Sequence, residues 1–319
     1  MKAVIPAAGA GTRLRPHTLN KPKALLPVAG RPILAHIVDD LAAAGIDSFV
    51  VVVGHHGQAV RDWFAAERPD LDIACVEQER RLGLGHAIWT AREAVADQPF
   101  YCVLGDTILE ADHGALLAGP DSAIGVCRVA DPRRFGVATV AGERVTGCVE
   151  KPAVPSSDLA MVGAYLFRDG AALMAALEGV IGDRQRTGGE YQLAAGLQRL
   201  LARGHVFRAV EVSGWHDCGE RETWLQSNRA LLDRDGAGEA GAMGPRTRVS
   251  GSRLGPHVSV GADVEIEDCE IRDAVIGAGS VLRGCRLHGS LVGEQCHLEG
   301  VVGAVNVGDF CELTAKEQG

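Results

Sequence analysis

In the first half of the chain, short apolar runs alternate with longer stretches in which apolar and polar residues follow a helical pattern. The short runs are continuous and rich in β-branched residues, as buried strands are, and the longer stretches repeat apolar residues at helical spacing. Strands are predicted at Lys2–Pro6, Ser48–Val53, Asp72–Val76 and Phe100–Leu104, and helices at Pro32–Ala44, Gln58–Glu67 and Gly85–Ala96. This order predicts an α/β domain with a mainly parallel sheet that helices cover on both faces.

The pattern changes in the middle of the chain. From Ala123 to Phe167 the segments are shorter and strand-like, and helical patterns return at Ala171–Glu178 and Glu190–Ala202. A strand-rich lobe inserted in the α/β domain, or appended to it, fits this change. Small and polar residues then dominate from Asp233 to Gly241, which is typical of a linker. We predict one domain over residues 1–235 and a linker over 236–247.

Beyond the linker, apolar residues recur at steps of five or six residues, and glycine follows several of them. The apolar positions are Leu254, Val260, Ile266, Ile271, Ile276, Leu282, Leu287, Val292 and Leu298. A hexapeptide period is typical of a parallel β-helix, whose stacked coils share one core. We therefore predict a β-helix domain of a few coils over residues 248–319. Its cysteines at 269, 285, 296 and 311 are expected in small inward corners. A β-sandwich, with apolar residues at every second position, is the alternative.

Composition and charge narrow the class of protein. The 319 residues are 46% hydrophobic, which is enough for a large core. No apolar run approaches the roughly 20 residues that span a bilayer, and no signal peptide is recognisable, so we predict a cytoplasmic protein without membrane association. The nine cysteines form no C-x-x-C pair, which argues against a zinc ribbon and a disulfide framework. A formal net charge of −9 argues against a nucleic-acid binder.

A glycine-rich loop follows the first strand and reads Ala7-Ala8-Gly9-Ala10-Gly11-Thr12-Arg13-Leu14. Its backbone N–H groups can cradle a polyphosphate, although such a turn is also a common strand-to-helix connection. The Rossmann pattern has glycine where Leu14 stands, and the P-loop requires Gly-Lys-Ser/Thr, so a nicotinamide cofactor and a Walker ATPase are both disfavoured. Lys23 follows Arg13 by ten residues, within Asn20-Lys21-Pro22-Lys23-Ala24-Leu25-Leu26-Pro27. Two cations therefore flank one candidate phosphate loop.

With these two segments the chain resembles the sugar-1-phosphate nucleotidylyltransferases. The family's signature, G-x-G-T-R-L followed by K-P-K-x-L-x-P, is reproduced at the family's spacing, and the resemblance covers roughly residues 1–232. It implies a Rossmann-like nucleotidyltransferase domain, followed here by a short left-handed parallel β-helix. It also implies that a nucleoside triphosphate binds along the loop, at Ala8, Gly9, Gly11 and Thr12. Arg13 and Lys23 would hold its phosphates while the α-phosphate is attacked, since nucleotidyl transfer brings two anions together and needs cations and Mg²⁺.

Two further segments resemble parts of the family's site that read the base and bind the metal. Within Glu77-Gln78-Glu79-Arg80-Arg81-Leu82-Gly83-Leu84-Gly85-His86-Ala87, the amide of Gln78 can both donate to and accept from a pyrimidine edge, and Gly83 lets backbone groups approach it. His86 is expected on the helix surface or in a structural hydrogen bond. Asp106, at the end of a strand, matches the family's metal-binding aspartate, and Asp217 lies in a segment similar to its later metal motif. Together they are expected to hold Mg²⁺, although either aspartate could instead cap a helix.

The sugar pocket is expected in three segments similar to those of the family. They are Arg134-Phe135-Gly136-Val137, Glu150-Lys151-Pro152 and Val162-Gly163-Ala164-Tyr165. Glu150 would accept hydrogen bonds from sugar hydroxyls, Lys151 would hold the sugar phosphate, and Gly136 and Gly163 would offer close backbone. Glu190 matches the start of a family helix and is a further sugar contact, although Ala194-Ala195 replaces the Thr-Asp that commonly follows.

The predicted activity is transfer of a nucleotidyl group from dTTP or UTP to glucose-1-phosphate, with release of pyrophosphate and no covalent enzyme intermediate. Some segments resemble uridylyltransferases, whereas Leu104-Gly105-Asp106 and the appended coils resemble thymidylyltransferases. A mannose-1-phosphate guanylyltransferase and a non-catalytic nucleotide-sugar sensor or assembly subunit are the alternatives. Acyl transfer on the β-helix is disfavoured by its few coils. The flat faces and open ends of these coils predict a homo-oligomer.

Overall fold

The computed structural model describes residues 1–315 and divides into two compact units. The first unit consists of Met1–Ala10 and Ile37–Trp215, and the second consists of Gly11–His36 and the chain from His216 onward. Neither unit is one continuous stretch of chain. The segment that carries Arg13 and Lys23 therefore belongs to the same unit as the C-terminal third.

The first unit is built on a nine-stranded sheet with the order β5-β4-β1-β6-β11-β8-β12-β10-β9. The strands are β1 (Lys2–Pro6), β4 (Ser48–Val53), β5 (Asp72–Glu77), β6 (Phe100–Val103), β8 (Ser122–Arg128), β9 (Gly136–Ala141), β10 (Arg144–Glu150), β11 (Leu159–Phe167) and β12 (Phe207–Glu211). β5, β4, β1 and β6 pair in parallel. β1, β4 and β6 are almost completely buried, which matches the apolar runs that predicted them, whereas β5 at the edge of the sheet is exposed or half-buried.

The other half of the sheet is mixed. β11 is antiparallel to both β6 and β8, β12 is parallel to β8, and β10 is antiparallel to both β12 and β9. The prediction of a mainly parallel sheet is thus right for β5, β4, β1 and β6 and for the pair of β8 with β12, and wrong for the antiparallel pairs of β11, β10 and β9. Between β9 and β10 the chain has only Gly142 and Glu143, which is too short for the crossover of a dozen or more residues that a parallel pair needs.

Eight α-helices are found among the described residues. They are α1 (Ile33–Ala43), α2 (Gly57–Glu67), α3 (Leu84–Thr90), α4 (Arg92–Val95), α5 (His113–Leu117), α6 (Gly170–Gly182), α7 (Leu193–Ala202) and α8 (Arg221–Arg234). The helix expected over 85–96 is interrupted at Ala91, and α7 begins at Leu193, so that Glu190 lies before it in a bridge with Thr187. No helix was predicted at α5 or at α8. Within residues 1–315 no helix combines the length and the apolar character needed to cross a bilayer.

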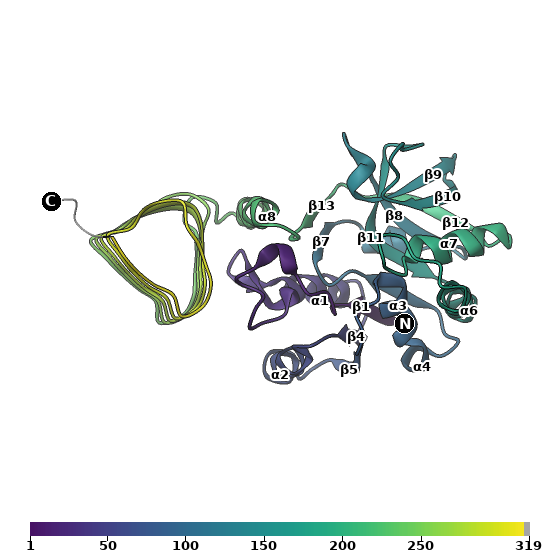
Figure 1. Cartoon of the computed structure of the whole chain (residues 1–319), viewed down its shortest axis with the longest axis horizontal. Helices are drawn as coiled ribbons and strands as arrows, with labels where there is room; N and C mark the ends of the chain where they lie inside the picture. Colours follow the sequence, from purple (N-terminus) through teal and green to yellow (C-terminus); the bar gives the residue numbers. More distant parts are fainter. Residues whose placement is uncertain (316–319) are drawn as a thin grey trace. The chain divides into compact units, whose positions relative to one another are not determined.

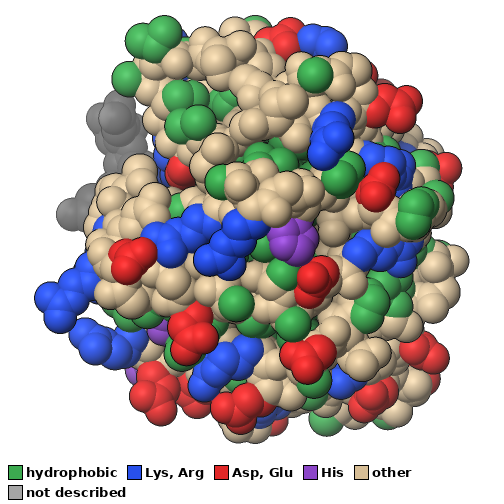
Figure 2. All heavy atoms as spheres, turned by 90° about the vertical axis from the view of Figure 1, so that its right-hand side faces the viewer, with side chains coloured by type: hydrophobic (Ala, Val, Ile, Leu, Met, Phe, Trp, Pro, Cys, Tyr) green, Lys and Arg blue, Asp and Glu red, His purple; other side chains and the backbone are tan. Residues whose placement is uncertain are grey.

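Helices α3, α6 and α7 pack on one another, and α7 packs on β10 (Figure 1). The core beneath them is fully buried and joins strand residues such as Val4, Phe100 and Ile124 to helix residues such as Ile88 and Leu197. On the face drawn in Figure 2, acidic and basic side chains are interspersed.

The C-terminal part of the second unit winds into stacked coils, drawn in green and yellow in Figure 1. Their strands are β14 (Ala242–Met243), β15 (Arg248–Ser250), β16 (Arg253–Leu254), β17 (Val258–Val260), β18 (Glu265–Glu267), β19 (Glu270–Ile276), β20 (Val281–Arg283), β21 (Arg286–Val292), β22 (His297–Glu299), β23 (Val302–Gly303), β24 (Asn306–Val307) and β25 (Glu312–Thr314). All pair in parallel. In one row Val249, Ile266, Leu282, Leu298 and Leu313 stand in register, at steps of 17, 16, 16 and 15 residues.

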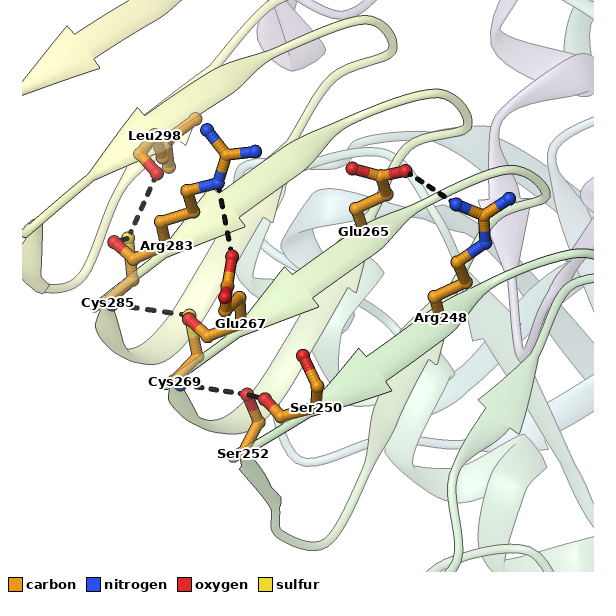
Figure 3. Close-up of polar contacts among 9 residues, drawn as sticks. All are labelled: Arg248, Ser250, Ser252, Glu265, Glu267, Cys269, Arg283, Cys285 and Leu298. Atoms are coloured by element: carbon orange, nitrogen blue, oxygen red, sulfur yellow. Dashed lines mark hydrogen bonds and ion pairs between the residues drawn. The ribbon is translucent and has the colours of Figure 1, made fainter.

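The interior of the coils follows the apolar positions of the sequence. Eight of the nine predicted positions are buried, and Leu254 packs against them partly buried. The cysteines stand in columns at the corners, where Ser252 Oγ accepts a hydrogen bond from the N–H of Cys269 at 2.9 Å and Cys269 Sγ accepts one from the N–H of Cys285 at 3.2 Å (Figure 3). Ion pairs such as Arg248 with Glu265 lie outside, on the solvent face of the same strands.

Glycines form a further column through the coils, at Gly244, Gly261, Gly277, Gly293 and Gly308. A Cβ placed on any of the first four would stand 2.3 to 2.6 Å from backbone atoms of the next coil. The coils therefore approach one another more closely at this corner than any other residue type allows.

Candidate nucleotide and sugar site

The ends of β1, β4 and β6 meet in the first unit, and this edge carries the start of the glycine-rich loop. The N–H of Gly105 donates to the carbonyl of Pro6 at 3.1 Å, and a Cβ on Gly54 would stand 2.8 Å from the carbonyl oxygen of Ala8. Ala8 and Gly9, predicted to bind nucleotide, thus lie at the carboxyl ends of parallel strands, where α/β sheets bind ligands. Gly54 was missed by the sequence reasoning. Its signal is a glycine directly after a buried strand.

Gln78 is buried just beyond the end of β5, with 5% of its surface exposed. Its amide nitrogen donates to the carbonyl of Gly83 at 3.2 Å and lies 2.9 Å from His86 Nδ1. Because an amide nitrogen only donates, His86 Nδ1 is the acceptor of this bond. Burial, followed by the charges of Arg80 and Arg92, lowers the pKa of His86, which keeps the ring neutral at pH 7. Both amide hydrogens of Gln78 are therefore engaged within the protein, and its Oε1 is oriented away from them.

Gly83 lies in the segment predicted to read the base (residues 77–87), where this segment contacts the residues before α7. Its φ is +103°, and a Cβ there would lie 2.7 Å from Glu190 Cβ and 2.8 Å from the carbonyl oxygen of Tyr191. The N–H of Tyr191 donates to the carbonyl of Leu82 at 2.7 Å, and the N–H of Gly85 donates to the carbonyl of Tyr191 at 2.8 Å. The structure thereby brings Gly83, predicted at the base, against Glu190, predicted at the sugar.

Four of the predicted sugar residues lie together. A Cβ on Gly136 would stand 3.0 Å from Glu150 Oε2, and Lys151 Nζ lies 3.7 Å from Glu150 Oε1. Burial raises the pKa of Glu150 above its usual value, while Lys151 lowers it and the nearby charge of Glu190 raises it again. Two carboxylates and one ammonium can thus present both acceptors and positive charge to a sugar phosphate.

Gly163 and Asp106 are held near the end of β6. The N–H of Leu104 donates to the carbonyl of Gly163 at 3.0 Å, and a Cβ on Gly163 would lie 2.8 Å from the Leu104 side chain. Asp106 follows two residues later, half-buried, and its Oδ1 accepts a hydrogen bond from Thr107 Oγ1 at 3.3 Å. The glycine therefore allows β11 to approach the residues that lead to the carboxylate.

In the second unit the chain that continues the glycine-rich loop folds back on itself. Gly11 has a φ of +59°, and its carbonyl accepts a hydrogen bond from Thr18 Oγ1 at 2.8 Å. A Cβ on Gly11 would lie 3.3 Å from Lys23 Cβ, so the glycine-rich loop and the lysine motif are neighbours in space. Lys23 is 8% exposed and begins a short 3₁₀ turn, whereas Arg13 is exposed on the turn that starts at Thr12.

The start of α8 lies against Arg13. Arg13 Nη1 is 2.5 Å from the Oε1 of Glu220, the residue that caps α8 together with Thr223. Asp217 is half-buried three residues earlier, at the end of β13 (Gly214–Asp217), and the backbone of Gly219 lies close to its carboxylate. Asp106 and Asp217 belong to different units. In the described part of the chain, no three His, Cys, Asp or Glu side chains gather as a metal site.

Residues 2–234 match the Nucleotidyl transferase family, and the chain belongs to it. The chain is therefore a nucleotidyltransferase, an enzyme of nucleotide-sugar biosynthesis.

Among its relatives, a glucose-1-phosphate thymidylyltransferase of Streptomyces griseus is 33% identical, with 92% of each chain covered. A UTP–glucose-1-phosphate uridylyltransferase of Haloferax volcanii is 34% identical over 73% of this chain and 97% of its own. Of the solved structures, a putative glucose-1-phosphate thymidylyltransferase from Bacillus anthracis in complex with a sucrose is similar with a TM-score of 0.64 at 26% identity, over 74% of this chain and 96% of its own. Similarity to the thymidylyltransferase thus extends into the C-terminal coils, whereas similarity to the uridylyltransferase covers a shorter part of the chain.

Proposed function

We propose that this enzyme transfers the nucleotidyl group of dTTP or UTP to glucose-1-phosphate, giving dTDP- or UDP-glucose and pyrophosphate. The observation that carries the choice of base is the orientation of Gln78, whose amide hydrogens are taken by Gly83 and His86. The relatives named for thymidylyl and uridylyl transfer to glucose-1-phosphate support the same choice.

The base is selected by an acceptor in this proposal. With its N–H groups engaged, Gln78 presents Oε1, which accepts a hydrogen bond from a base that carries N–H at its pairing edge. Thymine, uracil and guanine carry this N–H on the ring nitrogen, whereas cytosine and adenine have a bare ring nitrogen there and donate only from the neighbouring amino group. A base held with its ring nitrogen opposite Oε1 would then leave one buried acceptor facing another if that nitrogen is bare, and discrimination is strong when polar groups remain unpaired. This argument disfavours CTP and ATP and leaves GTP, with mannose-1-phosphate, as the second candidate.

The phosphates would bind at the glycine-rich loop, which begins in the first unit and continues into the second. The backbone N–H groups of the loop that runs through Ala8, Gly9, Gly11 and Thr12 would bind the triphosphate. Arg13 and Lys23 would offset the negative charge that gathers as the sugar phosphate attacks the α-phosphate in line. Arg13 would exchange its contact with Glu220 for a phosphate, because a guanidinium binds carboxylate and phosphate by the same geometry.

The sugar phosphate would bind at the cluster of Glu150, Lys151 and Glu190. The two carboxylates accept hydrogen bonds from sugar hydroxyls, and Lys151 supplies a compact charge to the phosphate. Gly136 and Gly163 would leave room for the sugar ring beside the backbone. The closeness of Glu190 to Gly83 supports a continuous path from base to sugar within the first unit.

Mg²⁺ is the proposed cofactor, with Asp106 and Asp217 as its protein ligands. Carboxylate oxygens fit this hard cation, which usually takes one or two carboxylates and completes its shell with waters and substrate phosphates. The absence of a larger cluster of acids in the described residues is compatible with that pattern. When bound, the ion would neutralise charge on the reacting phosphates.

We further propose that residues 1–235 form the catalytic domain, 236–247 a linker, and 248–319 a left-handed parallel β-helix of hexapeptide type. The parallel pairing of its strands supports the β-helix, although steps of 15 to 17 residues fall short of the roughly 18 that three whole hexapeptides give. β14, with Ala242 and Met243, lies in the proposed linker and already pairs with β17. The flat faces of the coils support a homo-oligomer, and use of nucleoside triphosphates supports a cytoplasmic location.

The test is pyrophosphate release with Mg²⁺ over a grid of dTTP, UTP, GTP, CTP and ATP against glucose-, N-acetylglucosamine-, galactose- and mannose-1-phosphate. We expect a signal confined to dTTP or UTP with glucose-1-phosphate. A signal for GTP with mannose-1-phosphate alone would establish the guanylyltransferase alternative. Silence across the grid with folded protein would favour a nucleotide-sugar sensor or assembly subunit.

A His86→Leu variant is expected to discriminate less well between bases. Without Nδ1, one amide hydrogen of Gln78 loses its acceptor, and the amide can turn to present its nitrogen to the substrate. One hydrogen bond contributes about 0.5–1.5 kcal/mol, so the ratio of kcat/KM for the preferred pyrimidine triphosphate to that for CTP should fall about 2- to 13-fold. His288→Leu, on the exposed face of β21, is the matched control and should leave the ratio unchanged. An unaltered ratio in His86→Leu would refute the role given to His86.

A further inference from the structure

Residues 11–26, the loop segment that carries Arg13 and Lys23, lie against the last coils of the same unit. His17, four residues after Arg13, is 3% exposed, and its Nε2 lies 2.9 Å from Asn306 Oδ1 in β24. Its ring stands edge-on to Trp224 of α8 at a centroid distance of 5.1 Å. Burial lowers the pKa of His17, so the ring is neutral and donates its Nε2–H to the amide oxygen. A residue of the loop thus fills a site built by the coils and α8.

Lys21 makes a second connection, two residues before Lys23. Its Nζ lies 2.5 Å from Glu294 Oε1 and 3.6 Å from Asp309 Oδ2, on two successive coils. The Lys21 and Asp309 side chains are only 16% and 6% exposed. Asp309 is itself fixed, since its Oδ1 accepts a hydrogen bond from the N–H of Glu294 at 2.9 Å. Glu294 is 47% exposed, so the shielded contact is the one between Lys21 and Asp309, which holds its geometry better than the exposed pairs on the outer face of the coils.

The glycine column of the coils ends at the same loop. A Cβ on Gly308, the last glycine of the column, would meet not another coil but Pro16 Cβ, at 2.8 Å. Pro16 therefore packs where a further coil would otherwise continue the column. Glycine at 308 permits this contact, as glycine permits the contacts between coils.

The chain just after the C-terminal end of the loop segment, at Pro27 and Ala29, is held by α8. Trp224 Nε1 donates to the carbonyl of Pro27 at 2.7 Å, and the N–H of Ala29 donates to Asn228 Oδ1 at 2.9 Å. α8 is in turn joined to the coils, because Arg229 forms a two-bond ion pair with Asp273. The segment is held on both sides of Lys23.

We propose that the last coils are a positioning element of the catalytic site, and that Lys21, through Glu294 and Asp309, fixes the loop that presents Arg13 and Lys23 to the triphosphate. Lys21 is a positioning residue that does not touch substrate. The inference rests on the proposed function for its kinetic consequence. Misplacement of a catalytic group by about 1 Å can cost on the order of 100-fold in rate, so a contact two residues from Lys23 can control turnover.

A charge exchange tests this on the full-length enzyme. Lys21→Glu faces two acids and should lower kcat/KM for the triphosphate about tenfold or more, with part of the loss in kcat. Glu294→Lys alone should also lower it. The double variant Lys21→Glu/Glu294→Lys should recover part of the loss, limited by Asp309. The matched control is the exposed pair Arg248 and Glu265 of Figure 3, whose single and double exchanges should leave kcat and KM unchanged.

Hydrogen exchange supplies a readout that is independent of catalysis. Amides of residues 11–26 should exchange faster in Lys21→Glu than in the parent, and the double variant should restore protection. Should Lys21→Glu fail to fold, the isosteric pair Glu294→Gln/Asp309→Asn removes the same attraction. Unchanged exchange and unchanged kcat in folded variants would overturn the proposal. If the parent protein releases no pyrophosphate but Lys21→Glu still exchanges faster, the proposed function would be refuted while the positioning of the loop would be supported.

Discussion

Replacement of Asp106 by Asn is expected to lower kcat for pyrophosphate release roughly 100- to 1,000-fold while the protein stays folded. Asn keeps the size of the side chain and an Oδ1 that can accept the hydrogen bond from Thr107. It loses the negative charge that a divalent cation requires. Steady-state kinetics at several Mg²⁺ concentrations measure the effect, and excess Mg²⁺ should recover only part of the rate.

The control for Asp106 is another aspartate whose role an amide can perform. Asp112 caps α5 by accepting a hydrogen bond from the N–H of Ala115 at 3.2 Å, and Asn is as good a cap. Asp112→Asn should therefore keep the parent kcat. A normal kcat in Asp106→Asn, or an equal loss in both variants, would contradict a specific metal-binding role for Asp106.

Replacement of Gly83 by Ala is expected to destabilise the first unit and weaken binding of the triphosphate. The backbone at φ +103° and ψ 173° is a conformation that only glycine adopts readily, which costs other residues about 1–3 kcal/mol. The added Cβ would also lie within 2.9 Å of both the N and the O of Tyr191, so α3 and the segment before α7 must separate. A fall in Tm of roughly 5 °C or more and a raised KM for the triphosphate should follow.

Gly182 provides the matched control for Gly83. It ends α6, its φ is not positive, and a Cβ there would meet no atom within 4 Å. Gly182→Ala should keep or slightly raise Tm, because alanine favours helix over glycine. Thermal unfolding of both variants, with and without triphosphate, compares them directly. Equal Tm values for the two variants would contradict the close packing at Gly83.

Local pattern was sufficient for much of the fold. Ser48–Val53 is predicted and observed as the same strand, because a short run of β-branched and aromatic residues between turn residues strongly favours a buried strand. The buried apolar positions of the C-terminal coils followed from a period that repeats many times. The mixed half of the sheet could not be predicted, since strand direction depends on how short connections such as Gly142-Glu143 return the chain, and hydrophobicity does not record it.

The site was predicted as segments and not as contacts. Gln78 and His86 were both in the motif, yet their hydrogen bond depends on how the turn at Gly83 places the start of α3. Arg13 and Glu220 are 207 positions apart, and nothing in either local sequence pairs them. Such contacts form between residues that only the folded chain brings together. The structure therefore shows them, whereas the hydrophobic pattern of the sequence does not.

The division of the chain at Ala10 and His36 has a consequence for its evolution. Recombination that joined the C-terminal third of a relative to this N-terminal part would leave Pro16, His17 and Lys21 facing unfamiliar coils. Such a chimera would need compensating substitutions in a loop almost 300 residues upstream of Asp309 before it could catalyse the reaction. The C-terminal coils should therefore be inherited together with the loop, as one co-evolving block, and not exchanged as a free module.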